Sequence, residues 1–274
     1  MKKSKKRYII VICVIVFFAA FCYWQNNMLV ISEYEYTNEK IANEMDGFTI
    51  VHLSDLHSKG FGKNQKRLIR KIEKCKPDII VITGDLVDER SKDFDNAAGL
   101  VRNAVEIAPV YYVTGNHEKW LSDDLYDKLM DMLRQEGVII LDNACIRISK
   151  GDSDFILAGL DDGSLLDDTL KELRLNDKKE LVVLLTHEPQ YIKDYSIYGA
   201  DLVLSGHAHG GQFRLPFIGG VYAPDQGFNP EYTSGVYEEN NTTMVVSRGL
   251  GNSVIPVRLF NFPDIVCVRF KAGT

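Results

Sequence analysis

The order of hydrophobic and polar positions along the chain predicts an alternation of strands and helices. Short runs rich in Val, Ile and aromatic residues are typical of strands, and apolar residues repeated at intervals of three and four are typical of helices. Strands are predicted over Met28–Tyr36, Phe48–Leu53, Asp78–Thr83, Val110–Thr114, Val138–Leu141, Ile146–Ile148, Phe155–Gly159, Leu181–Thr186 and Asp201–Ser205, with at least two more between Met244 and Phe270. Helices are predicted over Lys63–Lys76, Asn96–Ala108 and Ser122–Glu136. This order predicts an α/β fold.

The pattern contains no internal repeat and no low-complexity linker. We therefore expect one domain over residues 47–274, preceded by a connecting segment, residues 25–46, that carries the first strand. The polar stretch Asp161–Lys179 is expected to be a surface excursion with one short helix, and not a domain boundary.

Residues 8–24 form an uncharged apolar stretch behind a basic tail, residues 1–7. A membrane-spanning helix needs about 17–25 such residues, whereas the apolar region of a cleaved signal peptide runs about 7–15. Length therefore favours a transmembrane signal anchor. A cleaved signal peptide is the alternative, although Ala20-Phe21-Cys22 is a poor cleavage site. Because Lys and Arg stay in the cytoplasm, we expect a single-pass cell-membrane protein with its domain outside the cytoplasm.

Charge narrows the choice of partners. The chain has 32 Lys and Arg against 38 Asp and Glu, a formal net charge of −6, and the basic tail leaves the rest of the chain more acidic still. Binding to a nucleic-acid backbone needs a basic surface, so no nucleic-acid partner is expected. An acidic body is compatible with binding cations.

The candidate chemistry lies where predicted strands end. Five apolar runs are each followed at once by His, Asp or Asn, and five of the six histidines lie in these loops. In open α/β sheets, ligands bind beyond the carboxyl ends of the strands, so loops far apart in sequence converge on one site. The candidate metal ligands are Asp55, His57, Asp85, Asn116, His187, His207 and His209.

Imidazole combined with carboxylate suits borderline divalent ions, and the absence of cysteine from the set argues against a structural zinc site. Seven ligands are too many for one ion and fit two ions that share a bridging carboxylate. We therefore expect two divalent metal ions per chain, of the Mn, Fe or Zn type. His52, which lies within a predicted strand, is expected to be a packed or surface histidine and not a ligand.

The chain resembles the calcineurin-like metallophosphoesterase superfamily in five motifs, namely Asp55-Leu56-His57, Gly84-Asp85-Leu86-Val87-Asp88, Gly115-Asn116-His117-Glu118, His187 and Gly206-His207-Ala208-His209. Gly210–Pro216, Tyr222–Pro224 and Ser247–Gly251 look like the branch of small, membrane-tethered bacterial metallophosphoesterases. The resemblance covers about residue 47 to the end. It implies a four-layer αββα sandwich, with two central mixed sheets flanked by helices, and a dinuclear centre at one edge.

The resemblance also implies a role for each motif residue. One metal is held by Asp55, His57, Asp85 and His209; Asp85 bridges to a second metal, which Asn116, His187 and His207 complete. His117 is the catalytic residue, a general acid or a stabiliser of charge near the leaving-group oxygen, and the nucleophile is a metal-bridging hydroxide. Glu118 and Asp88 either orient ligands or make simple loop hydrogen bonds.

The function implied by the resemblance is metal-dependent hydrolysis of a phosphoester. An outward-facing domain would meet envelope material, so the expected substrate is a phosphodiester or pyrophosphate bond of an envelope lipid or wall component. The alternative is a membrane-displayed, non-catalytic scaffold of the same fold that binds a partner. Arg214, Arg248 and Arg258 are expected to be solvated, with contact to substrate phosphate as the alternative.

Overall fold

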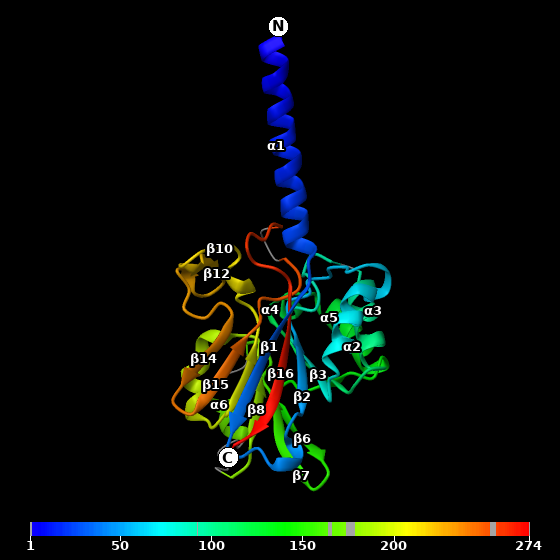
Figure 1. Cartoon of the computed structure of the whole chain (residues 1–274). Coiled ribbons are helices and arrows are strands. Elements are labelled where there is room, and N and C mark those ends of the chain that lie inside the picture. Colours follow the sequence, from blue (N-terminus) through cyan, green and yellow to red (C-terminus); the bar gives the residue numbers. More distant parts are fainter. Residues whose placement is uncertain (1, 92, 164–165, 174–178, 253–255, 274) are drawn as a thin grey trace.

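The computed structural model describes residues 2–91, 93–163, 166–173, 179–252 and 256–273. Figure 1 shows one long helix, α1, standing on a layered body of strands and helices. The described residues form two six-stranded sheets and two short hairpins. The hairpins pair β10 (Arg214–Leu215) with β11 (Gly219–Gly220) and β12 (Tyr222–Ala223) with β13 (Gly227–Phe228).

The first sheet joins the two ends of the chain. Its order is β1 (Val30–Asn38), β16 (Asp264–Ala272), β2 (Thr49–Leu53), β3 (Ile79–Thr83), β4 (Val110–Val113) and β5 (Ile139–Ile140). Only β16 and β2 are antiparallel neighbours. β1 runs parallel to β16 over its full length, from Val30 opposite Asp264 to Asn38 opposite Ala272. The segment that follows α1 is therefore the edge strand of the sheet.

The second sheet has the order β14 (Gly235–Glu239), β15 (Thr242–Val246), β9 (Leu202–Ser205), β8 (Val182–Leu185), β7 (Ser153–Gly159) and β6 (Ala144–Lys150). Its central pairs are parallel and its outer pairs are antiparallel. Both sheets are thus mixed, as predicted.

Helices cover the outer face of each sheet. On the first sheet lie α2 (Lys66–Cys75), α3 (Asp95–Ala104) and α5 (Asp123–Gln135), and on the second lie α6 (Leu166–Glu172) and α7 (Ile192–Ile197). A single turn, α4 (Asn116–Lys119), follows β4. Four 3-10 turns complete the described elements: η1 (Asn43–Met45), η2 (Lys63–Gln65), η3 (Pro189–Tyr191) and η4 (His209–Gly211). The four-layer αββα sandwich is confirmed.

The alternation of side chains along each strand fills three hydrophobic layers. In β2, Val51 and Leu53 pack with Leu68 of α2, whereas Ile50 packs with Phe155 of the other sheet. Successive strand side chains point to opposite faces, and every position of β2 and β3 is buried, so both faces of these strands are covered. A mostly apolar run without regular polar alternation is therefore the sequence pattern of a central strand in this sandwich.

Helix α1 (Lys2–Asn27) stands away from the body (Figure 1), and Lys5–Asn27 is long and apolar enough to cross a membrane. Its last turn is fixed to the domain. The Arg67 guanidinium donates to the Asn27 carbonyl at 2.8 Å, and the Lys59 ammonium donates to the Asn26 carbonyl. Cations are favourable at a helix C-terminus because the last carbonyls carry partial negative charge. The Trp24 and Phe262 rings pack at 5.1 Å.

Several predicted boundaries were wrong. The helix predicted from Lys63 begins at Lys66, because Asn64 and Gln65 have positive φ values of 49° and 57°. The helix predicted to end at Ala108 ends at Ala104. Helix α7 and strand β14 were not predicted. Of the predicted surface excursion, α6 is described and residues 164–165 and 174–178 lie outside the described residues.

Candidate metal centre

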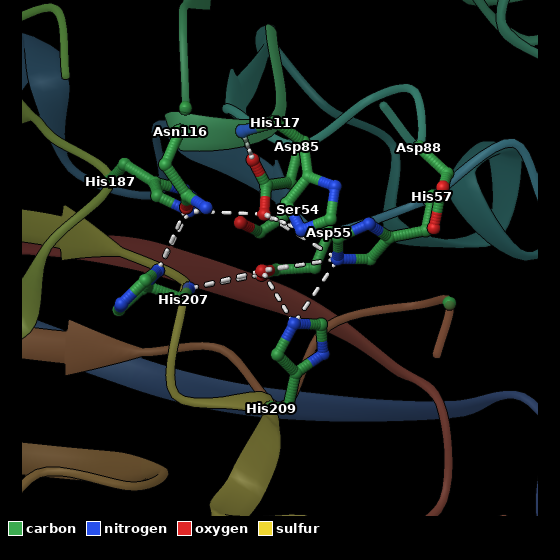
Figure 2. A network of polar contacts seen from close by, with 12 residues as sticks. Ser54, Asp55, His57, Asp85, Asp88, Asn116, His117, His187, His207 and His209 are labelled. Atoms are coloured by element: carbon green, nitrogen blue, oxygen red, sulfur yellow. Dashed lines mark hydrogen bonds and ion pairs between the residues drawn. The ribbon is translucent and has the colours of Figure 1, made fainter. Parts of the chain in front are cut away.

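The seven candidate ligands meet at one end of the two sheets, beyond the carboxyl ends of β2, β3, β4, β8 and β9 (Figure 2). Each follows its strand within a few residues, as the parallel order requires. All but Asn116 are at least 94% buried, so the cluster lies beneath the surface at the junction of the sheets. The structure therefore brings together every residue of the predicted set.

Four of these residues form one group. A single ligand atom from each of Asp55, His57, Asp85 and His209 lies within 4.8 Å of the other three. The His57 and His209 Nε2 atoms are 3.1 Å apart, and the Asp85 Oδ2 atom lies 3.5 Å from the His57 Nε2 atom. Two carboxylates and two imidazoles are a donor set that a divalent ion accepts.

A second group shares Asp85 with the first. Its other members are His187 and His207, whose ligand atoms lie within 4.8 Å of one another and of an Asp85 carboxylate oxygen. The Asn116 Oδ1 atom adds to it, at 3.0 Å from His187 Nε2 and 3.1 Å from His207 Nδ1. Asp85 therefore lies between the two groups, where a bridging carboxylate would be needed.

The hydrogen bonds of the second group set the tautomers of His187 and His207 so that their unprotonated nitrogens face each other and the Asn116 oxygen. The Nδ1 atom of His187 lies 2.8 Å from the Thr83 carbonyl, which can only accept, so Nδ1 carries the proton and Nε2 is left with a lone pair. The His207 Nε2 atom lies 2.7 Å from the Asp225 carboxylate, which leaves its Nδ1 atom free of a proton. With the Asn116 oxygen, three acceptors then lie about 3 Å apart, an arrangement that a cation stabilises.

The pKa values of Asp85 and its neighbours indicate that this buried carboxylate is stabilised by nearby positive charge. Burial raises the pKa of Asp85, but His187, His57 and His117 outweigh it and hold that pKa well below its usual value. Burial lowers the pKa of His187, yet Asp85 raises it more, so the net pKa lies above the usual value. The Asp85 carboxylate thus raises the proton affinity of its neighbour, and a divalent ion at the same place would supply that positive charge instead.

Neutral imidazoles characterise the other group. Burial lowers the pKa of His57 to about 3 against the opposing charge of Asp85, and it lowers the pKa of His209 well below its usual value. A metal ligand must offer an unprotonated nitrogen, so these shifts suit ligation.

Backbone strain is concentrated in the candidate ligands. Five of the seven have positive φ, namely Asp55 (52°), His57 (45°), Asp85 (51°), His207 (64°) and His209 (47°). For a residue with a Cβ this conformation costs roughly 1–2 kcal/mol, and it persists only where the surrounding structure imposes it. Such strain at five converging residues indicates a functional site and not a set of ordinary strand ends.

Two glycines allow the loops to approach one another. A Cβ on Gly84, which has φ of 78°, would lie 2.6 Å from the Gly115 Cα atom, and one on Gly115 would lie 2.5 Å from the Asp85 Oδ1 atom. Both contacts are too short for any side chain. The loops after β3 and β4 can therefore pack only with glycine at these positions.

Glu118 ties the same two loops together. Its fully buried carboxylate accepts hydrogen bonds from the backbone N–H groups of Asp85, Gly115 and Val87 at 2.8, 2.8 and 3.2 Å. Burial and the charge of Asp85 raise the pKa of Glu118, and the three N–H donors oppose that rise. Of the two roles expected for Glu118, fixing the loop that carries Asp85 is the one these contacts support.

His117 faces the first group without belonging to it. Its Nδ1 atom accepts a hydrogen bond from the Glu89 N–H at 3.3 Å, so in the neutral ring the proton is on Nε2, which lies 4.0 Å from Asp85 Oδ2. Its ring packs edge-on against His57, at 4.5 Å between centroids. Asp88 lies close to both histidines. A buried imidazole with a proton directed at the site is suited to donate that proton.

Two further expectations concern residues outside the ligand set. His52 is fully buried and its Nε2 atom lies 2.7 Å from the Thr83 hydroxyl, so it is a packed histidine, as expected. The expectation that Arg258 is solvated was wrong. It is 1% exposed and donates to the carbonyls of Gly251 and Arg248, which holds the loop behind Asp55.

Sequence reasoning did not identify Asp225. This residue lies in the turn between β12 and β13, is largely exposed, and reaches the His207 ring from the side opposite the candidate metal site. It directly follows the motif Tyr222–Pro224, but nothing in that motif indicates contact with a histidine of another loop. The contact becomes apparent only when the hairpin is placed beside the loop after β9.

Comparison with known proteins agrees with this fold. Residues 48–211 match the model of the calcineurin-like phosphoesterase family, which covers more than half of the chain. The fold and the clustered Asp and His residues define a metal-dependent phosphoester hydrolase. The chain belongs to the calcineurin-like phosphoesterase family.

Relatives extend the match beyond the family model. The uncharacterized metallophosphoesterase YkuE of Bacillus subtilis strain 168 is 32% identical over 260 residues, covering 91% of this chain and 88% of the relative. The phosphodiesterase YaeI of Escherichia coli K12 is 28% identical over 226 residues, covering 81% and 82%. The solved structure of TT1561 of Thermus thermophilus superposes with a TM-score of 0.50 at 14% identity, over 74% of this chain and 90% of that one, and shares the fold.

Proposed function

We propose that the protein is a dinuclear, metal-dependent hydrolase of phosphodiester or pyrophosphate bonds in envelope lipid or wall components. The observation that carries the proposal is the pair of ligand groups that share Asp85. One ion would be held by Asp55, His57, Asp85 and His209. The other would be held by Asp85, Asn116, His187 and His207.

Two divalent ions at these groups would activate water near neutral pH and neutralise the charged oxygens of the phosphoester. The chain supplies the surroundings. Glu118 fixes the Asp85 loop, Asp225 and the Thr83 carbonyl fix the tautomers of His207 and His187, and burial excludes bulk water. We assign His117 as the catalytic residue that donates a proton, or a hydrogen bond, to the leaving-group oxygen from Nε2.

The proposed organisation of the chain has four parts. Residues 1–7 form a cytoplasmic tail, residues 8–24 the membrane anchor, residues 25–46 the connecting segment with β1, and residues 47–274 the catalytic domain. The apolar helix and its basic start support an orientation with the domain outside the cytoplasm. The topology can be tested by fusing to the C-terminus a reporter enzyme that works only in the cytoplasm. Activity of this reporter would show that the domain lies in the cytoplasm and would contradict the proposed orientation.

The rival function is a non-catalytic scaffold that binds a partner. The two are separated by assaying the full chain, in a mild detergent, on bis-p-nitrophenyl phosphate and mono-p-nitrophenyl phosphate. We expect Mn-dependent release of p-nitrophenol, faster from the diester. Bound metal without turnover of either compound would support the scaffold. The complete set of ligands and the hydrogen bond from the Glu89 N–H that positions the His117 ring favour the enzyme.

A further inference from the structure

The end of α1 and the candidate metal centre share one cleft. The cleft has a volume of about 490 Å³, and its walls combine Tyr23 and Asn26 of α1 with His57 of the metal centre, Lys59 and Val257. Lys59 fixes this arrangement, because its ammonium donates to the Asn26 carbonyl and, at 3.2 Å, to the Leu250 carbonyl. A molecule in the cleft would touch the membrane helix and a metal ligand at once.

Exposed apolar side chains gather on the loops at the same end of the domain. We call Leu215, Phe217, Ile218, Phe228 and Phe260 the apolar rim. Phe217 is fully exposed, Phe228 is 82% exposed and Ile218 is 65% exposed. Single exposed apolar residues are ordinary, but several large ones on adjoining loops mark a surface that meets an apolar partner.

The apolar rim is joined to the helix and to the metal loop. The β10–β11 hairpin begins next to Phe213, which forms a β-bridge with Leu259. Phe260 follows Leu259 in the chain, and its ring packs on the Phe21 ring of α1 at 5.8 Å between centroids. Phe21 lies inside the segment long enough to span a membrane, so Phe260 is placed at the level of the bilayer surface. The Asn261 amide donates to the His209 carbonyl at 2.7 Å. Figure 1 shows β10 and β12 at the end from which α1 leaves.

A basic surface borders α1 on another side. Arg67 and Lys71 of α2 line a second cleft together with Tyr23 and Trp24 of α1. Arg70 and Lys74 continue this surface along α2. In a chain with net charge −6, a basic face beside the membrane helix complements anionic lipid headgroups. Apolar and basic surfaces thus border the base of the same helix.

We propose that this end of the domain rests on the bilayer crossed by α1, with the apolar rim inserted, and that the centre takes its phosphoester from a lipid in that bilayer. The substrate class rests on the proposed hydrolase function, whereas the docking does not. The headgroup phosphate would reach the metal centre through the cleft beside His57, and the acyl chains would stay beside α1. Water would add across the P–O bond, leaving one product with the phosphate and the other with a hydroxyl.

Bilayer contact can be measured without any activity. The full-length variants Phe217→Trp and Ile197→Trp would be placed in vesicles of phosphatidylcholine and phosphatidylglycerol whose acyl chains carry bromine. Ile197 is the control, since it is 67% exposed but lies on α7, outside the second sheet. After subtraction of the wild-type signal, we expect strong quenching of the indole introduced at 217 and little at 197. Equal quenching at positions 217 and 197 would overturn the docking. If light scattering then showed a dimer, the apolar rim would be assigned to contact with a second copy of the chain.

The substrate is tested in the same vesicles with diacylglycerophospho-p-nitrophenol, which yields phosphatidic acid and p-nitrophenol. The double variant Phe217→Ser, Ile218→Ser should lose roughly tenfold on this lipid, because two apolar side chains no longer enter the bilayer, and keep its rate on soluble bis-p-nitrophenyl phosphate. Ile197→Ser should keep both rates. An equal loss on both substrates would overturn the lipid proposal. If the wild-type chain hydrolyses neither compound, the proposed function fails, while the quenching result still decides the docking.

Discussion

The Asp225 Oδ2 atom lies 2.7 Å from the His207 Nε2 atom, on the side of the ring that faces away from Asn116 and His187. A carboxylate in this position fixes the ring and makes the opposite nitrogen a better metal ligand. An exposed residue of a short hairpin thereby acts on a buried centre.

This contact predicts that Asp225→Asn lowers the affinity for one of the two metals by about 10- to 100-fold. The amide keeps the size of the side chain but cannot hold the His207 proton as the carboxylate does. Titration of the metal-free full chain with Mn, followed by calorimetry, measures the change. Glu231→Gln, an exposed acid further along the same segment, is the control and should bind as wild type does. Equal affinities for Asp225→Asn and wild type would remove Asp225 from the site.

Asp85 should contribute to the binding of both metal ions. Asp85→Asn removes the charge that the two ligand groups share, so we expect loss of turnover together with loss of bound metal at both positions. Metal analysis of the purified variant, beside the surface variant Asp124→Asn, tests this. A variant that keeps one metal fully bound would show that Asp85 does not bridge.

His117 should separate catalysis from metal binding. His117→Ala removes the Nε2 proton near Asp85 without removing a proposed ligand, so both metals should stay while turnover falls by about 10²–10⁴-fold. The loss should be smaller with p-nitrophenol as the leaving group than with an alkyl alcohol, which needs the proton more. Trp120→Phe keeps a ring against His117 and is the control. Parallel loss of metal in His117→Ala would make His117 a ligand or a structural residue.

His52 predicts a pH dependence of stability that is unrelated to the reaction. Burial lowers the pKa of His52 to about 3, against the opposing charge of Asp55, so the folded chain keeps it neutral while the unfolded chain protonates it near pH 6.5. The contribution of neutral His52 to the stability of the folded chain is therefore fully present above pH 6.5 and is lost as the pH falls below this value. Between pH 7 and pH 5, the wild-type chain should lose about 2 kcal/mol more of its free energy of unfolding than His52→Gln.

Urea unfolding followed by circular dichroism measures this difference. Both proteins would be studied in detergent with EDTA, so that release of metal contributes to neither curve. The same pH dependence in wild type and variant would mean that His52 is protonated in the folded chain or is already neutral in the unfolded one.

Much of the architecture follows from local sequence patterns. The runs ending at Leu53 and Thr83 are mostly apolar and lack the regular polar alternation of a half-exposed strand, which indicates strands that are covered on both faces. Because parallel strands place their carboxyl ends together, the order of the runs also indicated which loops meet. The same patterns did not indicate η2, because a turn of positive-φ residues such as Asn64 and Gln65 leaves no periodic signal.

What the sequence did not predict depends on contacts between distant segments. Asp225 meets His207 only because the β12–β13 hairpin folds back on the loop after β9. The pairing of β1 with β16 joins segments more than 200 residues apart, and neither strand indicates its partner. Arg258 was expected in solvent because a charged residue in a glycine-rich loop is usually exposed, yet free carbonyls of its own loop satisfy it. Such contacts are properties of the assembled fold.

In the proposed reaction, two metal ions held through Asp85 are required for the hydrolysis. The most direct measurement is the metal content of the full chain, purified in detergent without chelator, combined with its rate on bis-p-nitrophenyl phosphate before and after EDTA and after added Mn. We predict close to two metals per chain and a rate that EDTA abolishes and Mn restores. A chain that binds no metal, or a rate that EDTA leaves unchanged, would contradict it.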